Sequence, residues 1–336
     1  MQIVLIDPLM TYRAHCVSET LGLMYIAAVL RDAGHGVRIV ATGLRPDAAL
    51  QPNDIADADL VGVTATSAIF GNATQVLATI RAWRPELPVI LGGAHATVST
   101  ESALRAGFDF ALIGEAEKTI IEFVSNLDRG QAQETRGIAF LDDTGAVHKT
   151  PEQSLIEDLD TLPFPARDLY DYERFRELGG WEFGMLSSRG CPFRCTFCQP
   201  TLNMIFGRMR KRGPENVAHE MALLAETYAP PILYFKDDTL SANGLQWFAR
   251  FRTELKERGV RQPWKCNTRV DKVGPRILDA MAEAGCEEVV FGVESGSQRI
   301  LDFYQKDIQV EDTVRAFDLC KERGIRAGAN VILGAP

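Results

Sequence analysis

Short apolar runs alternate with longer segments of helical periodicity along the first 130 residues. The runs contain few polar positions, which is typical of strands that are buried on both faces of a parallel sheet. The helix expected at 21–33 is apolar nearly all round, and Gly34 follows it in the usual C-terminal cap position. Five such units predict a doubly wound, flavodoxin-like (Rossmann-like) α/β domain. Strands are expected at 3–6, 37–41, 60–65, 88–91 and 108–113, and helices at 21–33, 72–83, 98–106 and 116–127.

A second series of strands and helices begins at residue 181. Repeated βα units with short loops predict part of a TIM-like barrel. Because the chain ends directly after its fifth expected strand, we expect this barrel to be truncated at its C-terminal side. Strands are expected at 183–188, 232–236, 264–269, 288–293 and 326–333, and helices at 215–227, 243–258, 274–284 and 311–323.

The segment between the two series carries no strand–helix repeat. Residues 136–150 predict a small hairpin that turns at Thr144 and Gly145. Residues 151–180 are rich in prolines and charges, which predicts a linker on the surface. The expected organisation is a first domain at 1–135, a hairpin and linker at 136–180, and a barrel domain at 181–336.

Both architectures place their ligands at the carboxyl ends of the parallel strands. In the first domain these are the loops 7–20, 64–72 and 92–98. Polar residues at strand ends are therefore the candidates for binding, and residues elsewhere in the strands are candidates for packing.

Composition narrows the class of protein. The net charge of −9 and the pI of about 5.2 argue against a protein that binds nucleic acid or an anionic membrane surface. No apolar run is long enough to span a bilayer, and the N-terminus lacks the basic lead of a signal peptide. We expect a cytoplasmic protein without nucleic-acid or membrane partners.

Three of the seven cysteines fall within one short stretch, as Cys191, Cys195 and Cys198. Thiolates at this spacing can hold three irons of a four-iron cluster and leave the fourth iron open to a ligand. One alternative is a structural zinc site, but zinc takes four protein ligands and Gln199 follows the last cysteine. Another is that three unrelated buried cysteines lie near each other by coincidence.

The cysteine motif, at the end of the first barrel strand, resembles that of the radical S-adenosylmethionine superfamily. The resemblance implies that a 4Fe-4S cluster binds S-adenosylmethionine through its open iron. An external electron donor of the flavodoxin or ferredoxin type then reduces the cluster, and the cofactor is cleaved to a 5′-deoxyadenosyl radical. Phe197 matches the family's aromatic position beside the adenine.

The ends of the later barrel strands resemble the cofactor-binding motifs of the same superfamily. The resemblance implies that Asp237 and Asp238 accept from the cofactor's ammonium group, although they also suit a solvated turn or helix cap. Arg269 is a candidate partner for the cofactor carboxylate, or a member of an internal ion pair. Glu294 and Ser295 match the ribose-contacting motif, and residues 330–334 match the adenine motif of the fifth strand.

Several pieces of the first domain resemble a cobalamin-binding domain. Their polar and glycine positions are Thr64, Thr66, Gly92, Gly93 and Glu115, where glycine would let the nucleotide tail pass close to the backbone. None of the five histidines stands in the D-x-H-x-x-G motif that supplies a cobalt ligand. His95, in the Gly-Gly loop, is the remaining candidate, and we expect a cobalamin with no histidine below the cobalt.

The leading interpretation is a cobalamin-dependent radical enzyme that methylates an unactivated carbon of a small molecule held between its domains. Cyclisation and rearrangement occur on the same architecture, and the fold does not choose among them. A first domain that binds no cobalamin and only docks substrate is one alternative, and a non-catalytic cobalamin or redox sensor is another. The basic run of Arg208, Arg210, Lys211 and Arg212 suits either a solvated loop or a clamp for an anionic ligand.

Overall fold

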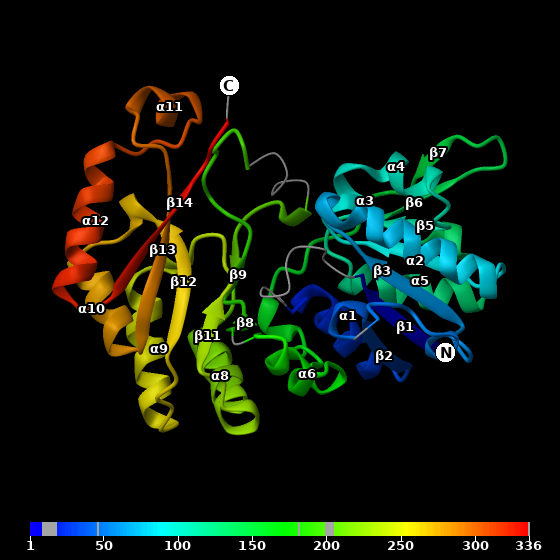
Figure 1. Cartoon of the computed structure of the whole chain (residues 1–336), viewed down its shortest axis with the longest axis horizontal. Coiled ribbons are helices and arrows are strands. Elements are labelled where there is room, and N and C mark those ends of the chain that lie inside the picture. Colours follow the sequence, from blue (N-terminus) through cyan, green and yellow to red (C-terminus); the bar gives the residue numbers. More distant parts are fainter. Residues whose placement is uncertain (9–18, 46, 181, 199–204, 335–336) are drawn as a thin grey trace. The chain divides into compact units, whose positions relative to one another are not determined.

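The chain forms two compact units, each built around a parallel β-sheet (Figure 1). The computed structural model describes all residues except 9–18, 46, 181, 199–204 and 335–336. The first unit comprises Met1–Ile156 and Leu162–Gly180, and the second comprises Glu157–Thr161 and Trp181–Pro336. The α/β fold class predicted from the strand pattern is confirmed.

The sheet of the first unit has the strand order β2-β1-β3-β4-β5-β6-β7. Its first five strands are parallel, and their order is the flavodoxin-like one. The predicted hairpin is present as β6 and β7, and it extends this sheet by antiparallel pairing with β5. The strands are β1 (Gln2–Asp7), β2 (Gly36–Ala41), β3 (Leu60–Thr64), β4 (Val89–Gly92), β5 (Phe110–Leu112), β6 (Ile138–Leu141) and β7 (Val147–Lys149).

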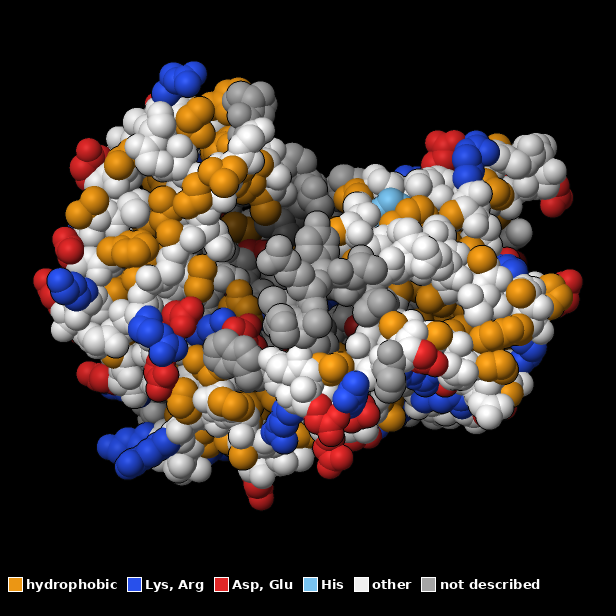
Figure 2. All heavy atoms as spheres, viewed as in Figure 1, with side chains coloured by type: hydrophobic (Ala, Val, Ile, Leu, Met, Phe, Trp, Pro, Cys, Tyr) orange, Lys and Arg blue, Asp and Glu red, His pale blue; other side chains and the backbone are white. Residues whose placement is uncertain are grey.

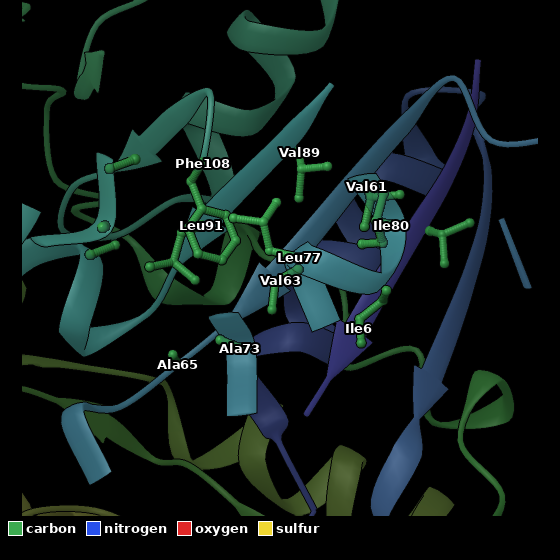
Figure 3. Packing of buried hydrophobic residues seen from close by; sticks show 14 of the residues in the cluster. Ile6, Val61, Val63, Ala65, Ala73, Leu77, Ile80, Val89, Leu91 and Phe108 are labelled. Atoms are coloured by element: carbon green, nitrogen blue, oxygen red, sulfur yellow. The ribbon is translucent and has the colours of Figure 1, made fainter. Parts of the chain in front are cut away.

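Helices cover both faces of this sheet, so the inner strands β1, β3 and β4 are buried on both sides, whereas the edge strands β2 and β7 are partly exposed. Along β1, Ile3 and Leu5 enter one core cluster, and Val4 and Ile6 enter the other. Figure 3 shows the second cluster, where side chains of β1, β3 and β4 pack against α2. The helices are α1 (Leu21–Asp32), α2 (Phe70–Trp83), α3 (Ala94–Val98), α4 (Thr100–Arg105) and α5 (Glu117–Asp128).

Two local features refine the expected helices. Gly34 ends α1 as predicted, with a φ of +86° and its N–H donated to the carbonyl of Arg31 at 2.8 Å. The single helix expected at 98–106 is instead two short helices, α3 and α4. The break falls at Ser99, whose φ of −133° and ψ of 45° interrupt the helical backbone.

The prediction that 151–180 forms a surface linker is wrong for much of this segment. Tyr172 and Phe175 lie in α6 (Tyr172–Glu177), and both are buried in the first unit. The hydroxyl of Tyr172 donates to Glu19, and Arg167 donates to that hydroxyl at 3.1 Å. The prolines suggested a linker, but the rings of Tyr170, Tyr172 and Phe175 pack on one another and are buried, which stabilises a packed segment.

The second unit contains a five-stranded, all-parallel sheet in the order β14-β13-β12-β11-β8. Helices α8, α9, α10 and α12 pack beside one another in sequence order, as the predicted partial barrel requires. A separate short ladder pairs β9 with β10. The elements are β8 (Glu182–Met185), β9 (Ser188–Arg189), β10 (Arg210–Lys211), α8 (Pro214–Tyr228), β11 (Ile232–Phe235), α9 (Leu245–Glu257), β12 (Trp264–Arg269), α10 (Pro275–Glu283), β13 (Cys286–Glu294), α11 (Gln298–Phe303), α12 (Val310–Glu322) and β14 (Arg326–Val331).

One face of the molecule can be compared for the distribution of its charged side chains. On the face shown in Figure 2, Lys and Arg side chains lie beside Asp and Glu side chains, and neither sign forms a large field of its own. Within the described residues, every helix is too short or too polar to cross a bilayer.

The buried hydroxyl of Tyr172 yields a prediction about stability. Tyr172→Phe removes buried hydrogen bonds between this hydroxyl and two charged groups, Glu19 and Arg167, so we expect it to lower the free energy of unfolding by about 1–3 kcal/mol. Asp168→Asn removes an exposed ion pair with Arg31 from the same segment and should cost about 0–1 kcal/mol. Urea denaturation measures both, and equal effects would contradict the buried network.

Candidate functional site

A cavity of about 250 Å³ opens at the carboxyl ends of the strands of the second unit. All three cysteines of the motif line it. The ends of β11, β12, β13 and β14 contribute Asp238, Arg269, Glu294 and Asn330 respectively. Residues that are far apart in the sequence thus meet around the cysteines, at the end of the sheet where the strand pattern predicted a site.

The cysteine loop is held by its backbone on two sides. Gly190 precedes it with a φ of +79°, and a Cβ there would lie 2.9 Å from the carbonyl oxygen of Arg208. The N–H of Thr196 donates to the carbonyl of Tyr304 at 2.9 Å, and that of Cys198 donates to Cys195 at 3.1 Å. The positions of the three sulfurs therefore depend on glycine in the entry turn and on the segment that follows α11.

The electrostatic surroundings of the sulfurs are mixed. Burial raises the pKa of the Cys198 thiol to about 11, and the negative charges of Asp238, Cys191 and Cys195 contribute in the same direction. Lys236, Arg269 and Lys306 line the same cavity and supply positive charge. Three cysteines in one cavity that three cationic side chains also line fit a cluster bound by three thiolates.

The two neighbouring aspartates occupy different environments. Asp237 is buried, and its carboxylate accepts from the Ser187 N–H at 3.0 Å, from the Ser187 hydroxyl at 2.7 Å and from the Ser188 hydroxyl at 2.5 Å. Burial raises the pKa of this carboxyl above its usual range. Both aspartates line the cavity, but Asp238 is the more exposed of the two. Partial burial, and then the negative charge of Asp237, raise the pKa of the Asp238 carboxyl to about 6. Asp238 is therefore the aspartate placed to meet a ligand's ammonium group.

Arg269 forms an internal ion pair, which was the alternative to a cofactor contact. Its Nε donates to Asp271 at 2.9 Å, and its Nη2 donates to the carbonyl of Lys306 at 2.5 Å. Its Nη1 points at the sulfur of Cys195, at 3.4 Å. All three guanidinium nitrogens thus have partners within the protein.

Glu294 ends β13 in a left-handed backbone conformation, with a φ of +63°. Its Oε1 accepts from Lys306 Nζ at 2.8 Å in a buried ion pair. A Cβ on Gly292 would lie 2.7 Å from that oxygen and 2.9 Å from that nitrogen, so glycine leaves room for the pair. Ser295, the other predicted ribose contact, does not line the cavity, and its hydroxyl accepts from the Ser297 N–H at 3.1 Å.

Lys306 is the main site residue that the sequence reasoning missed. Besides its pair with Glu294, its Nζ lies 5.7 Å from the centroid of the Phe197 ring. Phe197 is 44% exposed and packs edge-on against Tyr304 at 5.2 Å. A single lysine after a short helix carries no pattern in one sequence, because only tertiary packing shows that it is buried.

In the first unit, the predicted Gly-Gly turn follows β4. Gly93 has a φ of +88°, and a Cβ there would lie 2.8 Å from the Ala65 carbonyl oxygen and 2.9 Å from the Thr64 hydroxyl. A Cβ on Gly92 would meet no atom within 4 Å. Gly93 is therefore needed for packing the turn on β3, whereas Gly92 leaves open space that a ligand could enter.

His95 follows this turn and is 6% exposed. Its Nδ1 lies 3.0 Å from the Ser67 hydroxyl, and its ring stacks on Phe70 at 3.8 Å. Its Nε2 is enclosed and has no hydrogen-bond partner among the described residues. Burial lowers the pKa of this imidazole. Because the second ring nitrogen is enclosed, this arrangement does not fit a histidine that ligates cobalt.

The remaining predicted residues of the first domain gather near the same sheet edge. Thr64 ends β3, Thr66 is exposed in the following loop, and Glu115 accepts from the Ile156 N–H at 3.3 Å. Thr97, which the sequence reasoning did not single out, accepts from the Gly114 N–H at 2.9 Å and donates to the Gly93 carbonyl at 3.4 Å. It thereby joins the loops that follow β4 and β5.

Asp7 ends β1 at this edge and was also missed. Burial raises the pKa of its carboxyl to about 6, against the opposing effect of a 2.7 Å hydrogen bond from the Thr20 hydroxyl. A carboxyl whose pKa is raised by burial at the end of a strand is typical of a binding or catalytic site, so Asp7 supports a ligand site at this edge. The loop that follows, with Cys16, lies outside the described residues.

The basic run does not form a clamp with free cations. Arg208 pairs with Glu157, and Arg212 pairs with Glu220 at 2.5 Å. Lys211 donates to two backbone carbonyls, at 2.7 and 3.1 Å, and Arg210 donates to the carbonyl of Phe206 at 3.0 Å. These side chains stabilise the short β9–β10 ladder and its surroundings, because each is directed to a partner within the unit.

Two family models match this chain. The model for the B12 binding domain matches residues 12–124, and the model for the radical SAM superfamily matches residues 185–336. An uncharacterized methyltransferase of Pyrococcus horikoshii is 34% identical over 328 residues, covering 94% of this chain and 69% of the relative. The anaerobic magnesium-protoporphyrin IX monomethyl ester cyclase of Rubrivivax gelatinosus is 27% identical over 324 residues, covering 92% of this chain and 58% of the relative.

Solved structures show the same arrangement of secondary structure. The radical S-adenosylmethionine methyltransferase TsrM of Kitasatospora setae aligns with a TM-score of 0.82 at 20% identity, covering 100% of this chain and 68% of TsrM. That protein has been solved with tryptophan and an S-adenosylmethionine analogue, and with cobalamin and a [4Fe-4S] cluster. At this identity the likeness establishes the fold.

The Gly-Gly turn yields a prediction about backbone strain. Gly93→Ala places a methyl group against the Ala65 carbonyl in a backbone region that is nearly exclusive to glycine, so we expect a loss of about 1–3 kcal/mol in stability. Gly92→Ala meets open space and is the matched control, expected to change stability by less than about 0.5 kcal/mol. Denaturant unfolding of both variants measures the difference, and equal effects would contradict the packing of Gly93 on β3.

The raised pKa of Asp7 yields a prediction about pH. A carboxyl whose folded pKa of about 6 exceeds its unfolded value of 3.8 binds its proton more tightly in the folded state, so its contribution to stability is lost as pH rises from about 4 to 6. Asp7→Asn should therefore stabilise the protein by about 1–3 kcal/mol at pH 8 and by less at pH 5. Unfolding midpoints at both pH values measure this effect, and a variant less stable than wild type at pH 8 would refute it.

Proposed function

We propose that this chain, which belongs to the radical S-adenosylmethionine enzymes with an N-terminal B12-binding domain, transfers a methyl group to an unactivated carbon of a small molecule. It is a cobalamin-dependent radical enzyme of the methyltransferase family, and its cofactors are a 4Fe-4S cluster, S-adenosylmethionine and cobalamin. The observation that carries the proposal is the cavity in which the three cysteines meet the strand-end residues of the second unit.

In this proposal Cys191, Cys195 and Cys198 hold the cluster, because their sulfurs line one cavity among cations. Asp238 accepts from the ammonium group of S-adenosylmethionine, since it is exposed where it lines the cavity and the carboxylate of Asp237 is already bonded to Ser187 and Ser188. Glu294 contacts the ribose and Phe197 lies beside the adenine. Arg269 lines the wall of the cavity and Ser295 lies outside it, and both support these residues.

When bound, the cluster supplies the electron that cleaves S-adenosylmethionine and cobalamin supplies the methyl group. The protein's own residues position these partners. Lys306 holds Glu294 by a 2.8 Å ion pair and balances its charge. The cluster must be reduced by an external donor of the flavodoxin or ferredoxin type.

For cobalamin we propose the carboxyl edge of the first sheet, with Thr64, Thr66, Gly92, Gly93 and Glu115 around its nucleotide tail. The open space beside Gly92 supports this placement, and the enclosed Nε2 of His95 supports a cobalamin without a histidine ligand.

Methyl transfer is favoured over cyclisation because the Pyrococcus relative, at 34% identity, is named a methyltransferase. Cyclisation is the second candidate reaction, since the Rubrivivax cyclase is 27% identical. The two reactions differ in their products, because methyl transfer yields S-adenosylhomocysteine alongside 5′-deoxyadenosine.

Cysteine variants test the proposed cluster ligands. After anaerobic reconstitution with iron, sulfide and hydroxocobalamin, Cys191→Ala, Cys195→Ala and Cys198→Ala should each lose most of the bound iron and sulfide. Each removes one of three thiolates that hold the cluster. Cys320→Ala is the matched control, since that thiol is buried on α12 and does not line the cavity. Full cluster content in any of the three variants would remove that cysteine from the site.

The same reconstituted protein tests the rest of the proposal. Retained cobalamin whose cobalt(II) electron paramagnetic resonance spectrum lacks nitrogen splitting would agree with the histidine-free site. Splitting, or no retained cobalamin in a folded protein with its cluster, would contradict it. Formation of S-adenosylhomocysteine by the reduced enzyme supports methyl transfer, and its absence beside 5′-deoxyadenosine favours the second candidate reaction.

A further inference from the structure

We propose that Arg269 sets the reduction potential of the iron–sulfur cluster through its contact with the sulfur of Cys195. This inference rests on the proposed function, in which Cys195 is a cluster ligand. Arg269 would then act on the cluster from within the protein, as a positioning residue, instead of binding the cofactor carboxylate.

The guanidinium is fixed in one orientation by three different contacts. Nε donates to Asp271 at 2.9 Å and Nη2 to the carbonyl of Lys306 at 2.5 Å, so the remaining Nη1 is directed at Cys195 Sγ at 3.4 Å. The planar fork of arginine can serve three acceptors in this way, whereas a lysine ammonium on a flexible stem cannot hold the same geometry.

The burial of Arg269 limits the screening of its charge by water and salt. Arg269 is 5% exposed, and its Cζ lies 4.0 Å above the centroid of the Phe193 ring. Water and salt screen a buried charge far less than an exposed one.

The consequence for the cluster is electrostatic. One-electron reduction takes the cluster core from 2+ to 1+, which adds one negative charge to a centre already bound by three thiolates. A neighbouring cation and an N–H···S hydrogen bond both favour the more negative state, so they raise the reduction potential. Asp271 works in the opposite direction, because its carboxylate lies against the same guanidinium.

The experiment is a potentiometric titration of the reconstituted protein, with the reduced cluster followed by electron paramagnetic resonance and without S-adenosylmethionine. Arg269→Gln removes the charge and the directed N–H, so the potential should become more negative. We expect the ratio of reduced to oxidised cluster at a fixed potential to fall about tenfold, which corresponds to about 59 mV for one electron.

Two further variants distinguish a specific effect of Arg269 on the potential from a general loss of structure. Lys272→Gln removes the same unit charge from the other partner of Asp271, but Lys272 is 42% exposed and the contact to Cys195 stays, so its shift should be small beside that of Arg269→Gln. Asp271→Asn leaves Arg269 in place and removes the opposing charge, so the potential should rise.

The outcomes are distinguishable. A wild-type protein without iron and sulfide, or Cys195→Ala with a full cluster, would refute the proposed ligands themselves. A full cluster in Arg269→Gln with the potential of wild type, or with the shift of Lys272→Gln, would overturn the role of Arg269. If Arg269→Gln takes up no cluster, Arg269→Lys decides, because it keeps the charge and loses the N–H directed at Cys195: a lowered potential supports the role and an unchanged one overturns it.

Discussion

The buried carboxylate of Asp237 is the constraint on which the cysteine loop depends. It ends β11 and accepts a backbone N–H and two hydroxyl groups from Ser187 and Ser188, which lie just ahead of the loop. A carboxylate with its oxygens so occupied holds a strand end in place, because withdrawing any donor would leave part of a buried charge unsatisfied. The entry to the loop is thereby tied to the residues that follow β11, and the positions of the sulfurs depend on this attachment.

From this anchor a chain of contacts runs across the cavity. Cys195 meets Arg269, Arg269 binds the carbonyl of Lys306, and the Lys306 ammonium pairs with Glu294. The contacts join the cysteine loop, β12, the segment after α11 and the end of β13. The cluster side and the nucleoside side of the cavity are therefore not independent, because both depend on where residues 304–307 lie.

Much of this architecture could be predicted from the sequence, and the failures have physical causes. Strand positions followed from apolar runs, and the site followed from the cysteine spacing and the strand ends. Asp237 and Asp238 are adjacent and chemically identical, so only the fold shows that Asp237 is buried in internal hydrogen bonds and that Asp238 is exposed at the cavity. The role of Lys306 and the burial of Tyr172 likewise arise from contacts between distant segments, which no local pattern encodes.

The left-handed backbone at Glu294 limits how the protein can be improved by engineering. Glycine would adopt a φ of +63° without strain, and at most such positions it would be the stabilising choice. At Ala229, which ends α8 with a φ of +43°, that substitution costs no polar contact. At Glu294 it would discard the partner of a buried lysine, so a gain in backbone energy would be exchanged for an unpaired charge inside the cavity. A redesign for stability that places glycine at both positions would therefore stabilise the end of α8 at Ala229 and remove the ion pair with Lys306 at Glu294.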